Sequence, residues 1–395
     1  MRVSRIVARI CSPCLAVVHV VRWTAVLAVI ESIVRSRRLS LSAIGRAMPG
    51  PALAKHNIKR VDRLLANPHL RGEHWFYFEA VTRWLLRDCL RPVILVDWTM
   101  VAPGYFALVA ATPVAGRALP IYQEVHRERV LANHRVEIRF LRTLRTILPE
   151  DCRPTVVTDA GFRGPFFREV LSLGWHFVGR VRGNAQFRLP FDGPMVTKDD
   201  LYKRAKLVPA DLGSCQLYAV RNPMKVRLVL VRSRRRPGPP SPPSYYHKVI
   251  QYRGMARDPW LLATSLEAET PEQVVGIYAL RMKIEETFRD VKNHRFGWSL
   301  HHVRSKSTDR LTVLLLLASL AMIAVTLLGF ATERNNVHRS YQANTDKRRV
   351  LSLFVLGLAV LARGEHQEML QPRTFPHVSL AFAQHIRAFG LDPPH

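Results

Sequence analysis

The residues best suited to chemistry lie in one stretch, YALRMKIEETFRDVK, at positions 278–292. A helix advances about 100° per residue, so five of the polar side chains fall within about 80° of arc and share one face. A solvated amphipathic helix with ion pairs has the same pattern. The face sets one carboxylate among cationic and phenolic groups: Tyr278, Arg281, Glu285, Arg289 and Lys292.

Two further acids each follow an apolar run of strand length. Asp97 ends PVILVD and Asp159 ends PTVVTD. Ligands of open α/β sheets lie beyond strand ends, and neighbouring carboxylates repel each other unless a cation joins them. Either acid alone is typical of a cap or turn. As a pair at matching strand ends they predict a metal site that Glu285 would complete, because Glu286 points about 100° away.

The elements that would position these acids follow the order strand, strand, strand, helix, strand, helix, strand. The first three strands should be antiparallel, because short turns containing Pro103-Gly104 and Gly116 join them. This order predicts an α/β ribonuclease H-like fold, a mixed sheet flanked by helices. We expect the strands at 92–97, 105–112, 117–125, 154–159 and 175–183, and the helices at 134–148 and 165–172.

The first 90 residues predict a separate all-α DNA-binding domain. A short helix at 39–48, a breaker turn and a second helix match a helix-turn-helix. The second helix has an apolar side and a strongly basic side, a pattern that a solvated basic helix shares. Its candidate DNA contacts are Lys55, Lys59, Arg60 and Arg63.

The remaining domain boundaries are placed where the pattern of residues along the sequence changes. Residues 91–182 form the first part of the predicted catalytic domain, and residues 266–335 return to it with the Glu285 helix. Between them, residues 183–265 predict a β-rich insertion with the short runs QLYAV, VRLVLV and HKVIQYR. The insertion carries a basic proline-rich loop, RSRRRPGPPSPPSYY, suited to DNA contact or to a plain hairpin tip. Residues 336–395 form a C-terminal helical region.

Composition narrows the class of protein. The 395 residues are 48% hydrophobic, enough for a globular protein of two or three domains. Lys and Arg number 59 against 30 acids, a net charge of +29, which favours a polyanionic partner: nucleic acid first, an anionic membrane surface second. Five cysteines form an odd set, so we expect no disulfide framework. CSPC at 11–14 resembles half a zinc site or a redox pair without its context.

One apolar run, LTVLLLLASLAMIAVTLLGF at 311–330, is as long as a membrane-spanning helix. A helix buried between the layers of a large α/β domain is also apolar all round. Because the run stands alone in the sequence, we expect a core helix and no membrane partner. At the N-terminus, Arg9, His19 and Arg22 interrupt the apolar residues, which argues against an export signal.

Three separated motifs carry a resemblance to a known family. VDWT with Asp97, TDAGF with Asp159, and the spacing of Tyr278, Arg281, Glu285 and Lys292 together resemble the insertion-sequence-four family of bacterial DDE transposases. Four segments are similar to its insertion-sequence-ten branch, the transposase of the tetracycline-resistance transposon. They are KHNIKRVDRLL, GWHFVGRVRG, PWLLATSL and RMKIEETFRDVK, and the similarity covers nearly the whole chain.

The resemblance implies a cut-and-paste transposase that binds element ends, hydrolyses one strand, forms a hairpin and joins the end to target DNA. Asp97, Asp159 and Glu285 would be the catalytic acids and would hold two divalent metal ions, magnesium or manganese in its place. A homodimer on paired ends of double-stranded DNA is implied, in the bacterial cytoplasm and associated with the nucleoid.

The resemblance also assigns DNA contacts. Tyr278, Arg281 and Lys292 would grip the 5′ phosphate region of the cut end, and Arg289 lies on the same face. Trp260, in DPWLLATSL, matches a tryptophan that stacks on a flipped base. Two alternatives stay open: an inactive or domesticated DNA-binding relative, which the three acids disfavour, and a structure-specific nuclease, which would not need the end-binding domain.

Overall fold

The computed structural model describes residues 2–183, 185–218, 220, 222–232, 258–293, 297–300, 303–343, 345–364 and 370–392. The chain divides into two compact units. Unit 1 is Met1–Pro154 with Met282–His395, and unit 2 is Thr155–Arg281. The predicted strand HKVIQYR and nearly all of the proline-rich loop lie outside the described residues.

Unit 1 is built on an antiparallel sheet in the order β3-β2-β1, which confirms the predicted antiparallel strands. The strands are β1 (Val93–Ala102), β2 (Tyr105–Val114) and β3 (Arg117–Arg127). Ala115 and Gly116, both with positive φ, form the tight turn between β2 and β3.

The prediction that Asp97 closes the first strand is wrong. β1 runs on to Ala102, and Asp97 lies within it, opposite Val109 of β2. The strand continues because Trp98, Thr99 and Val101 are aromatic or β-branched residues that favour extended backbone and keep pairing with β2. Asp159, in contrast, directly follows β4 (Thr155–Thr158) of unit 2.

Helices cover both faces of the unit 1 sheet. On one face, Tyr122 of β3 contacts Phe78 of α5 (Pro68–Leu85) and Phe140 of α6 (His134–Ile147). On the other face, Gln123 donates a hydrogen bond to Ser319 of α12 at 2.9 Å. Helix α11 (Met282–Lys292) also contacts β1, β2 and β3. The sheet is therefore a middle layer.

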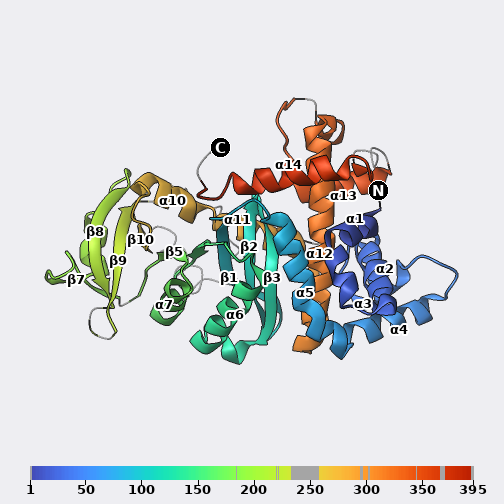
Figure 1. The fold of residues 1–395 in the computed structure, drawn as a ribbon, viewed down its shortest axis with the longest axis horizontal. Helices are drawn as coiled ribbons and strands as arrows, with labels where there is room; N and C mark the ends of the chain where they lie inside the picture. The colour runs from blue at the N-terminus through green and yellow to red at the C-terminus, as the bar shows by residue number, and fades with distance from the viewer. Residues whose placement is uncertain are drawn as a thin grey trace, which may run out of the picture. The chain divides into compact units, whose positions relative to one another are not determined.

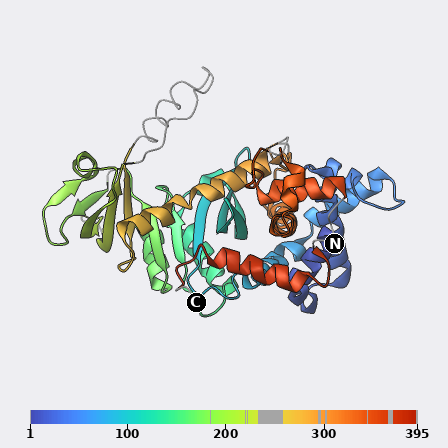
Figure 2. The same ribbon diagram turned by 90° about the horizontal axis from the view of Figure 1, so that it is seen from above.

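The apolar run predicted as a core helix forms α12 (Thr308–Arg334). It is the one helix of the described residues that is long and apolar enough to cross a membrane. Of its most apolar stretch of 18 residues, 94% is buried inside the structure. Figures 1 and 2 show it surrounded by other elements of unit 1. It packs against β3, α1 (Val3–Ile10), α2 (Val20–Ser36), α13 (Leu353–Arg363) and α14 (Phe375–Arg387). This burial is typical of a core helix.

The N-terminal part of unit 1 is helical, as predicted. After α1 come η1 (Ser12–Ala16), α2, α3 (Leu41–Arg46) and α4 (Ala54–Leu65). Helices α3 and α4 touch closely, because a Cβ at Gly45 would come within 2.6 Å of Ile58 Cα. All five cysteines of the chain are buried and free of disulfides.

Unit 2 contains a mixed sheet, which agrees with the predicted α/β class. β4 and β5 are parallel, and the other strand pairs of the unit are antiparallel. β10 (Trp260–Thr264) pairs with both β5 and β9, so the strands of the predicted insertion continue the sheet. The order is β4, β5 (His176–Arg180), β10, β9 (Met224–Val231), β8 (Ala210–Leu217), β6 (Gln186–Arg188) and β7 (Met195–Thr197), with helices α7 (Gly164–Ser172), α8 (Lys198–Lys203) and α10 (Pro271–Ala279).

The prediction of one helix over 278–292 is also wrong. α10 ends at Ala279 and α11 begins at Met282. At the break, Arg281 N donates to Tyr278 O at 3.0 Å, a bond to the third residue back. Such bonds tighten a helix into a 3₁₀ turn and change the direction of its side chains. Neither glycine nor proline marks this position, so local sequence contains no signal for it.

Candidate active site

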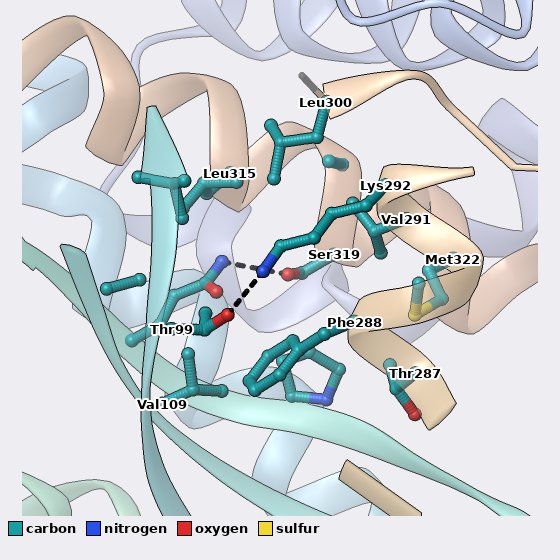
Figure 3. A pocket seen from close by; sticks show the side chains of 15 residues that line it. Thr99, Val109, Thr287, Phe288, Val291, Lys292, Leu300, Leu315, Ser319 and Met322 are labelled. Carbon is teal, nitrogen blue, oxygen red and sulfur yellow. Dashed lines mark hydrogen bonds between the residues drawn. The ribbon is translucent and has the colours of Figure 1, made fainter. Parts of the chain in front are cut away.

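Side-chain alternation along β1 places Asp97 on the face that α11 covers. Trp98 Nε1 donates to Glu137 Oε1 of α6 at 3.0 Å, so Trp98 points to the α6 face. Thr99 Oγ1 accepts from Lys292 Nζ of α11 at 2.8 Å, so Thr99 points to the opposite face (Figure 3). Successive residues of a strand alternate between faces. Asp97 therefore shares the side of Thr99.

Lys292 reaches this face from within a largely apolar surrounding. Its side chain borders a cavity of about 40 Å³ together with Phe288, Val291 and Leu315 (Figure 3). Burial lowers the pKa of the Lys292 ammonium, and the negative charge of Asp97 opposes that shift. The ammonium is thus held at β1 within the electrostatic reach of Asp97.

Glu285 lies in the first turn of α11 and is half-buried. About two helical turns separate it from Lys292, which brings both side chains to nearly the same face of the helix. The reverse face is buried through Ile284, Thr287 and Asp290. Unit 1 therefore presents the Glu285 and Lys292 face of α11 together with the strand that carries Asp97.

Arg289 occupies a different environment from Lys292. Its side chain is 66% exposed and its Nη1 bonds Glu286 Oε2 at 2.8 Å. The structure does not bring it to β1. Its position leaves the guanidinium accessible to a ligand from solvent.

Asp159 is held by a turn of its own within unit 2. Its Oδ1 accepts the backbone N–H of Gly161 at 2.8 Å. A Cβ at position 161 would come within 3.0 Å of that oxygen, so the turn is tight for any residue other than glycine. This side-chain-to-backbone bond fixes the orientation of the carboxylate directly after β4.

Unit 2 also brings together Trp260, Tyr278 and Arg281. The rings of Trp260 and Tyr278 meet edge to face, with centroids 4.9 Å apart. Burial raises the pKa of the Tyr278 hydroxyl, while the charges of Arg281 and Arg180 oppose the shift and that of Asp159 adds to it. The hydroxyl is therefore neutral at pH 7, within electrostatic reach of Asp159.

The sequence prediction missed Arg180, at the end of β5. Its Nη2 donates to the carbonyls of Asp258 at 3.0 Å and Pro259 at 3.2 Å, directly before Trp260. Burial lowers the pKa of its guanidinium. Arg180 thus holds the backbone of the two residues that precede Trp260. The only signal for it was its place in the segment GWHFVGRVRG.

The basic face of α4 is confirmed as an exposed surface. Val61, Leu64 and Leu65 are buried against unit 1. Arg60 and Arg63 line an open groove of about 730 Å³, which His19 and Thr24 also line. All four predicted basic contacts, Lys55, Lys59, Arg60 and Arg63, are exposed. Contact with DNA stays a prediction.

Comparison with known families decides the class of protein. The family model described as "Transposase DDE domain" matches residues 89–324, more than half of the chain. The chain belongs to the DDE transposases. Members of this family are metal-dependent enzymes that cleave DNA, typically with magnesium. The matched range contains β1, β4 and α11 of the transposase. A search of curated proteins finds no match.

The acids of the transposase fit a divalent metal by their chemistry. Carboxylate oxygens are the donors that magnesium and manganese prefer. Asp97 and Glu285 belong to unit 1 and Asp159 to unit 2. Among the described residues no group of three acids, histidines or cysteines is gathered into a preformed metal site. Each acid is instead fixed by its own unit, through β1, the α11 helix and the Asp159 turn.

Proposed function

We propose that this transposase is a cut-and-paste enzyme of the insertion-sequence-four family, on its insertion-sequence-ten branch. Asp97, Asp159 and Glu285 are its catalytic and metal-holding acids. The observation that carries the proposal is the contact of α11 with β1. Lys292 Nζ meets Thr99 on the strand face of Asp97, and Glu285 lies on the same helix face as Lys292.

The residue types account for the chemistry. Two divalent ions held by the three carboxylates would activate a water or 3′ hydroxyl and stabilise the departing oxygen of an in-line displacement. The protein's own part is to hold Asp97 rigidly within β1 and to aim Asp159 through its bond to Gly161 N. Strand hydrolysis, hairpin formation and joining to target DNA would use this one set of acids in turn.

The cationic and aromatic residues would hold the DNA. Lys292, Tyr278 and Arg281 grip the 5′ phosphate region at the cut end, and exposed Arg289 adds a further charge. Trp260 offers an aromatic face for a flipped base beside Tyr278. The basic face of α4 binds the element ends as part of the helical N-terminal domain. We further propose a homodimer that acts on paired transposon ends and on target DNA, in the bacterial cytoplasm and associated with the nucleoid.

A cleavage assay tests the assignment. Purified transposase, magnesium and a DNA fragment bearing the parent element's end should yield strand cuts at the element boundary. Asp97→Asn, Asp159→Asn and Glu285→Gln should each abolish cutting while end binding stays close to wild type. Normal cleavage by any of the three would falsify the site assignment.

The same substrate separates the alternative functions. A structure-specific nuclease would cut without regard to the element end and would not join the cut end to a target plasmid. An inactive DNA-binding relative would bind ends without cutting them. Joined products and hairpin ends, resolved on denaturing gels, are the outcome that the proposal expects.

A further inference from the structure

We propose that Thr287 and Asp290 are positioning residues that fasten α11 from behind and so set the placement of Glu285 and Lys292. The proposal rests on the proposed catalytic role of Glu285. Thr287 and Asp290 lie about 140–160° around the helix from Glu285. They are only 3% and 9% exposed. The face opposite the proposed chemistry is therefore polar and buried, where apolar residues would be the usual choice.

Thr287 joins α11 to the first residues of β3. Its hydroxyl accepts from Ala118 N at 2.8 Å and donates to Ala118 O at 2.9 Å. The Lys283 carbonyl is also within range at 3.0 Å. The one hydroxyl proton is shared between the Ala118 and Lys283 carbonyls, while the hydroxyl oxygen accepts from Ala118 N. A shift of α11 along β3 would break both bonds together.

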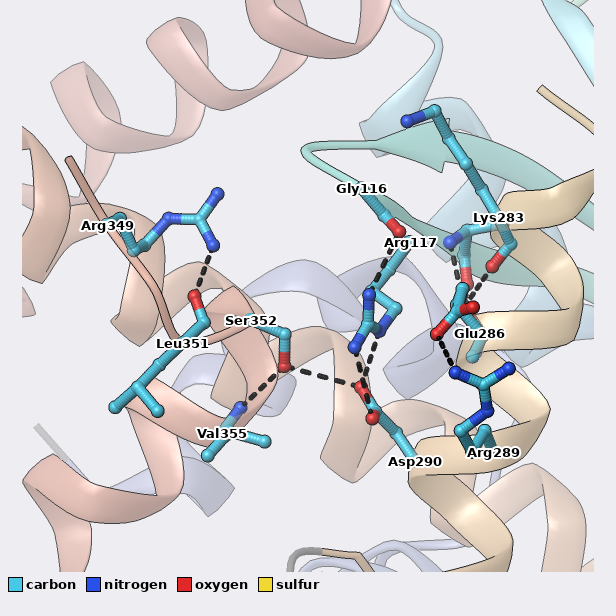
Figure 4. Close-up of polar contacts among 12 residues, drawn as sticks. Gly116, Arg117, Lys283, Glu286, Arg289, Asp290, Arg349, Leu351, Ser352 and Val355 are labelled. Atoms are coloured by element: carbon cyan, nitrogen blue, oxygen red, sulfur yellow. Dashed lines mark hydrogen bonds and ion pairs between the residues drawn. The ribbon is translucent and has the colours of Figure 1, made fainter. Parts of the chain in front are cut away.

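Asp290 joins α11 to two further elements (Figure 4). Its carboxylate accepts from Arg117 Nε at 2.7 Å and from Arg117 Nη2 at 3.3 Å, a bidentate pair. It also accepts from Ser352 Oγ at 3.3 Å. The same Ser352 oxygen accepts from Val355 N at 3.2 Å as the N-cap of α13. The serine proton is therefore directed to Asp290.

The partners of Asp290 are themselves rigidly placed. Arg117 follows the Ala115-Gly116 turn and donates a further bond to Gly116 O at 3.1 Å. The start of α13 lies directly on α12, because a Cβ at Gly329 would come within 1.9 Å of Leu353 O. These contacts connect α11 to the β2–β3 hairpin and, through the start of α13, to the buried core helix α12.

A purely stabilising role would have different consequences from a positioning role. Loss of stability alone lowers the unfolding temperature and leaves the magnesium dependence of the folded enzyme unchanged. Misplacement of a catalytic group by about 1 Å can cost about 10²-fold in rate. If α11 moves, the site should also need more magnesium for half-maximal cleavage.

Matched substitutions distinguish the two roles. Thr287→Val keeps the shape and removes the hydroxyl, whereas Thr287→Ser keeps the hydroxyl. Asp290→Asn removes the charge at nearly constant size. Asp211→Asn is the control, since Asp211 of β8 also accepts two bonds from one arginine, from Arg227 Nε at 2.9 Å and from Arg227 Nη2 at 2.7 Å.

Thermal unfolding gives the stability of each full-length variant, and three further measurements test the site. Single-turnover cleavage of pre-bound end DNA is followed as magnesium is titrated. End binding is measured with calcium in place of magnesium. Amide hydrogen exchange of residues 282–292 is measured on the protein without metal or DNA, which makes this readout independent of activity.

We expect Thr287→Val and Asp290→Asn to cleave about 10- to 100-fold more slowly. They should also show a raised half-saturating magnesium concentration, faster exchange in α11 and unchanged end binding. Thr287→Ser should stay near wild type, and Asp211→Asn should change stability alone.

The proposal is overturned if Thr287→Val and Asp290→Asn match Asp211→Asn, with lower stability but wild-type rate and magnesium dependence. Glu285→Gln in the same assay keeps the two proposals apart. Normal cleavage by Glu285→Gln removes the proposed function. An inactive Glu285→Gln beside fully active Thr287→Val and Asp290→Asn removes only the positioning role.

Discussion

Lys292 illustrates at the scale of one residue how the fold prepares a charge for a ligand. Its ammonium donates to Thr99 and is within the electrostatic reach of Asp97 while its stem is buried among apolar groups. An ammonium has three donors, so the bond to Thr99 does not exhaust it. A phosphate oxygen could therefore be added without rebuilding the site.

Lys292→Ala should weaken the end complex and lower the slope of its salt dependence by about one ion, as the loss of one phosphate contact does. Binding isotherms at a series of potassium chloride concentrations measure the slope. Lys203→Ala removes a lysine whose side chain is 79% exposed on α8 and serves as the control. An unchanged slope for Lys292→Ala would contradict the phosphate contact.

Glu124 of β3 is a second residue whose surroundings have a measurable consequence. It accepts hydrogen bonds from Tyr122 at 2.6 Å, His126 at 2.9 Å and Arg139 at 3.4 Å. Burial alone would raise the pKa of its carboxyl, but the bonds from His126 and Tyr122 and the charge of Arg139 outweigh it and lower the pKa. The ionised carboxylate therefore stabilises the folded state.

A carboxyl with a lowered folded pKa stabilises above its unfolded pKa, and this stability is lost as the pH falls through the folded value. Glu124→Gln should reduce the free energy of unfolding by about 1.5–3 kcal/mol at pH 7. The loss should shrink below the ordinary glutamate pKa of 4.5. Urea titrations from pH 7 to pH 3 measure both. If the free energies of unfolding of the two proteins ran parallel from pH 7 to pH 3, Glu124 would not contribute to acid unfolding.

At the scale of elements, the contact between α12 and α13 depends on two glycines. A Cβ at Gly357 would come within 2.1 Å of Val325 O, and one at Gly329 within 1.9 Å of Leu353 O. The two helices therefore touch backbone to backbone. This close contact holds α13, and with it the Ser352 cap, against the core helix.

Gly357→Ala should destabilise the protein by about 1–3 kcal/mol, because the added methyl group forces the helices apart. Gly276→Ala is the control within α10, since a Cβ there meets nothing within 4 Å. It should stabilise by about 0.5–1 kcal/mol through helix propensity. Thermal unfolding compares the two variants. Equal shifts for both would show that α12 and α13 are not tightly packed.

The break between α10 and α11 is the other result at this scale. It assigns Tyr278 and Arg281 to the unit of Asp159, and Glu285 and Lys292 to the unit of Asp97. One motif of the sequence therefore supplies residues to both units.

At the scale of the whole molecule, the burial of α12 distinguishes a core helix from a membrane helix. Because 94% of its most apolar 18-residue stretch is buried by other parts of the same protein, we expect the full-length protein to purify without detergent. The α12 amides should be among its slowest to exchange with deuterium. Exchange mass spectrometry on the detergent-free protein tests this. Recovery only in detergent, with α12 protected only by lipid vesicles, would reverse the assignment.

Much of this protein could be predicted from local residue patterns alone. Apolar runs placed β1 to β5 in the correct order, the separation of apolar and basic residues identified α4, and the motifs around Asp97, Asp159 and Glu285 indicated a DDE transposase, which the comparison confirmed. These features are local: side-chain periodicity and turn residues act over a few neighbours along the chain. Patterns of this short range can be recognised in the sequence without knowledge of the tertiary structure.

Tertiary packing decided the rest. Asp97 lies inside its strand because β2 supplies hydrogen-bond partners beyond it. The helix at 278–292 divides at Leu280 without any helix-breaking residue. Thr287 and Asp290 look like ordinary polar helix residues until Ala118, Arg117 and Ser352 meet them from distant segments. Such contacts join residues far apart along the chain, and no local pattern encodes them.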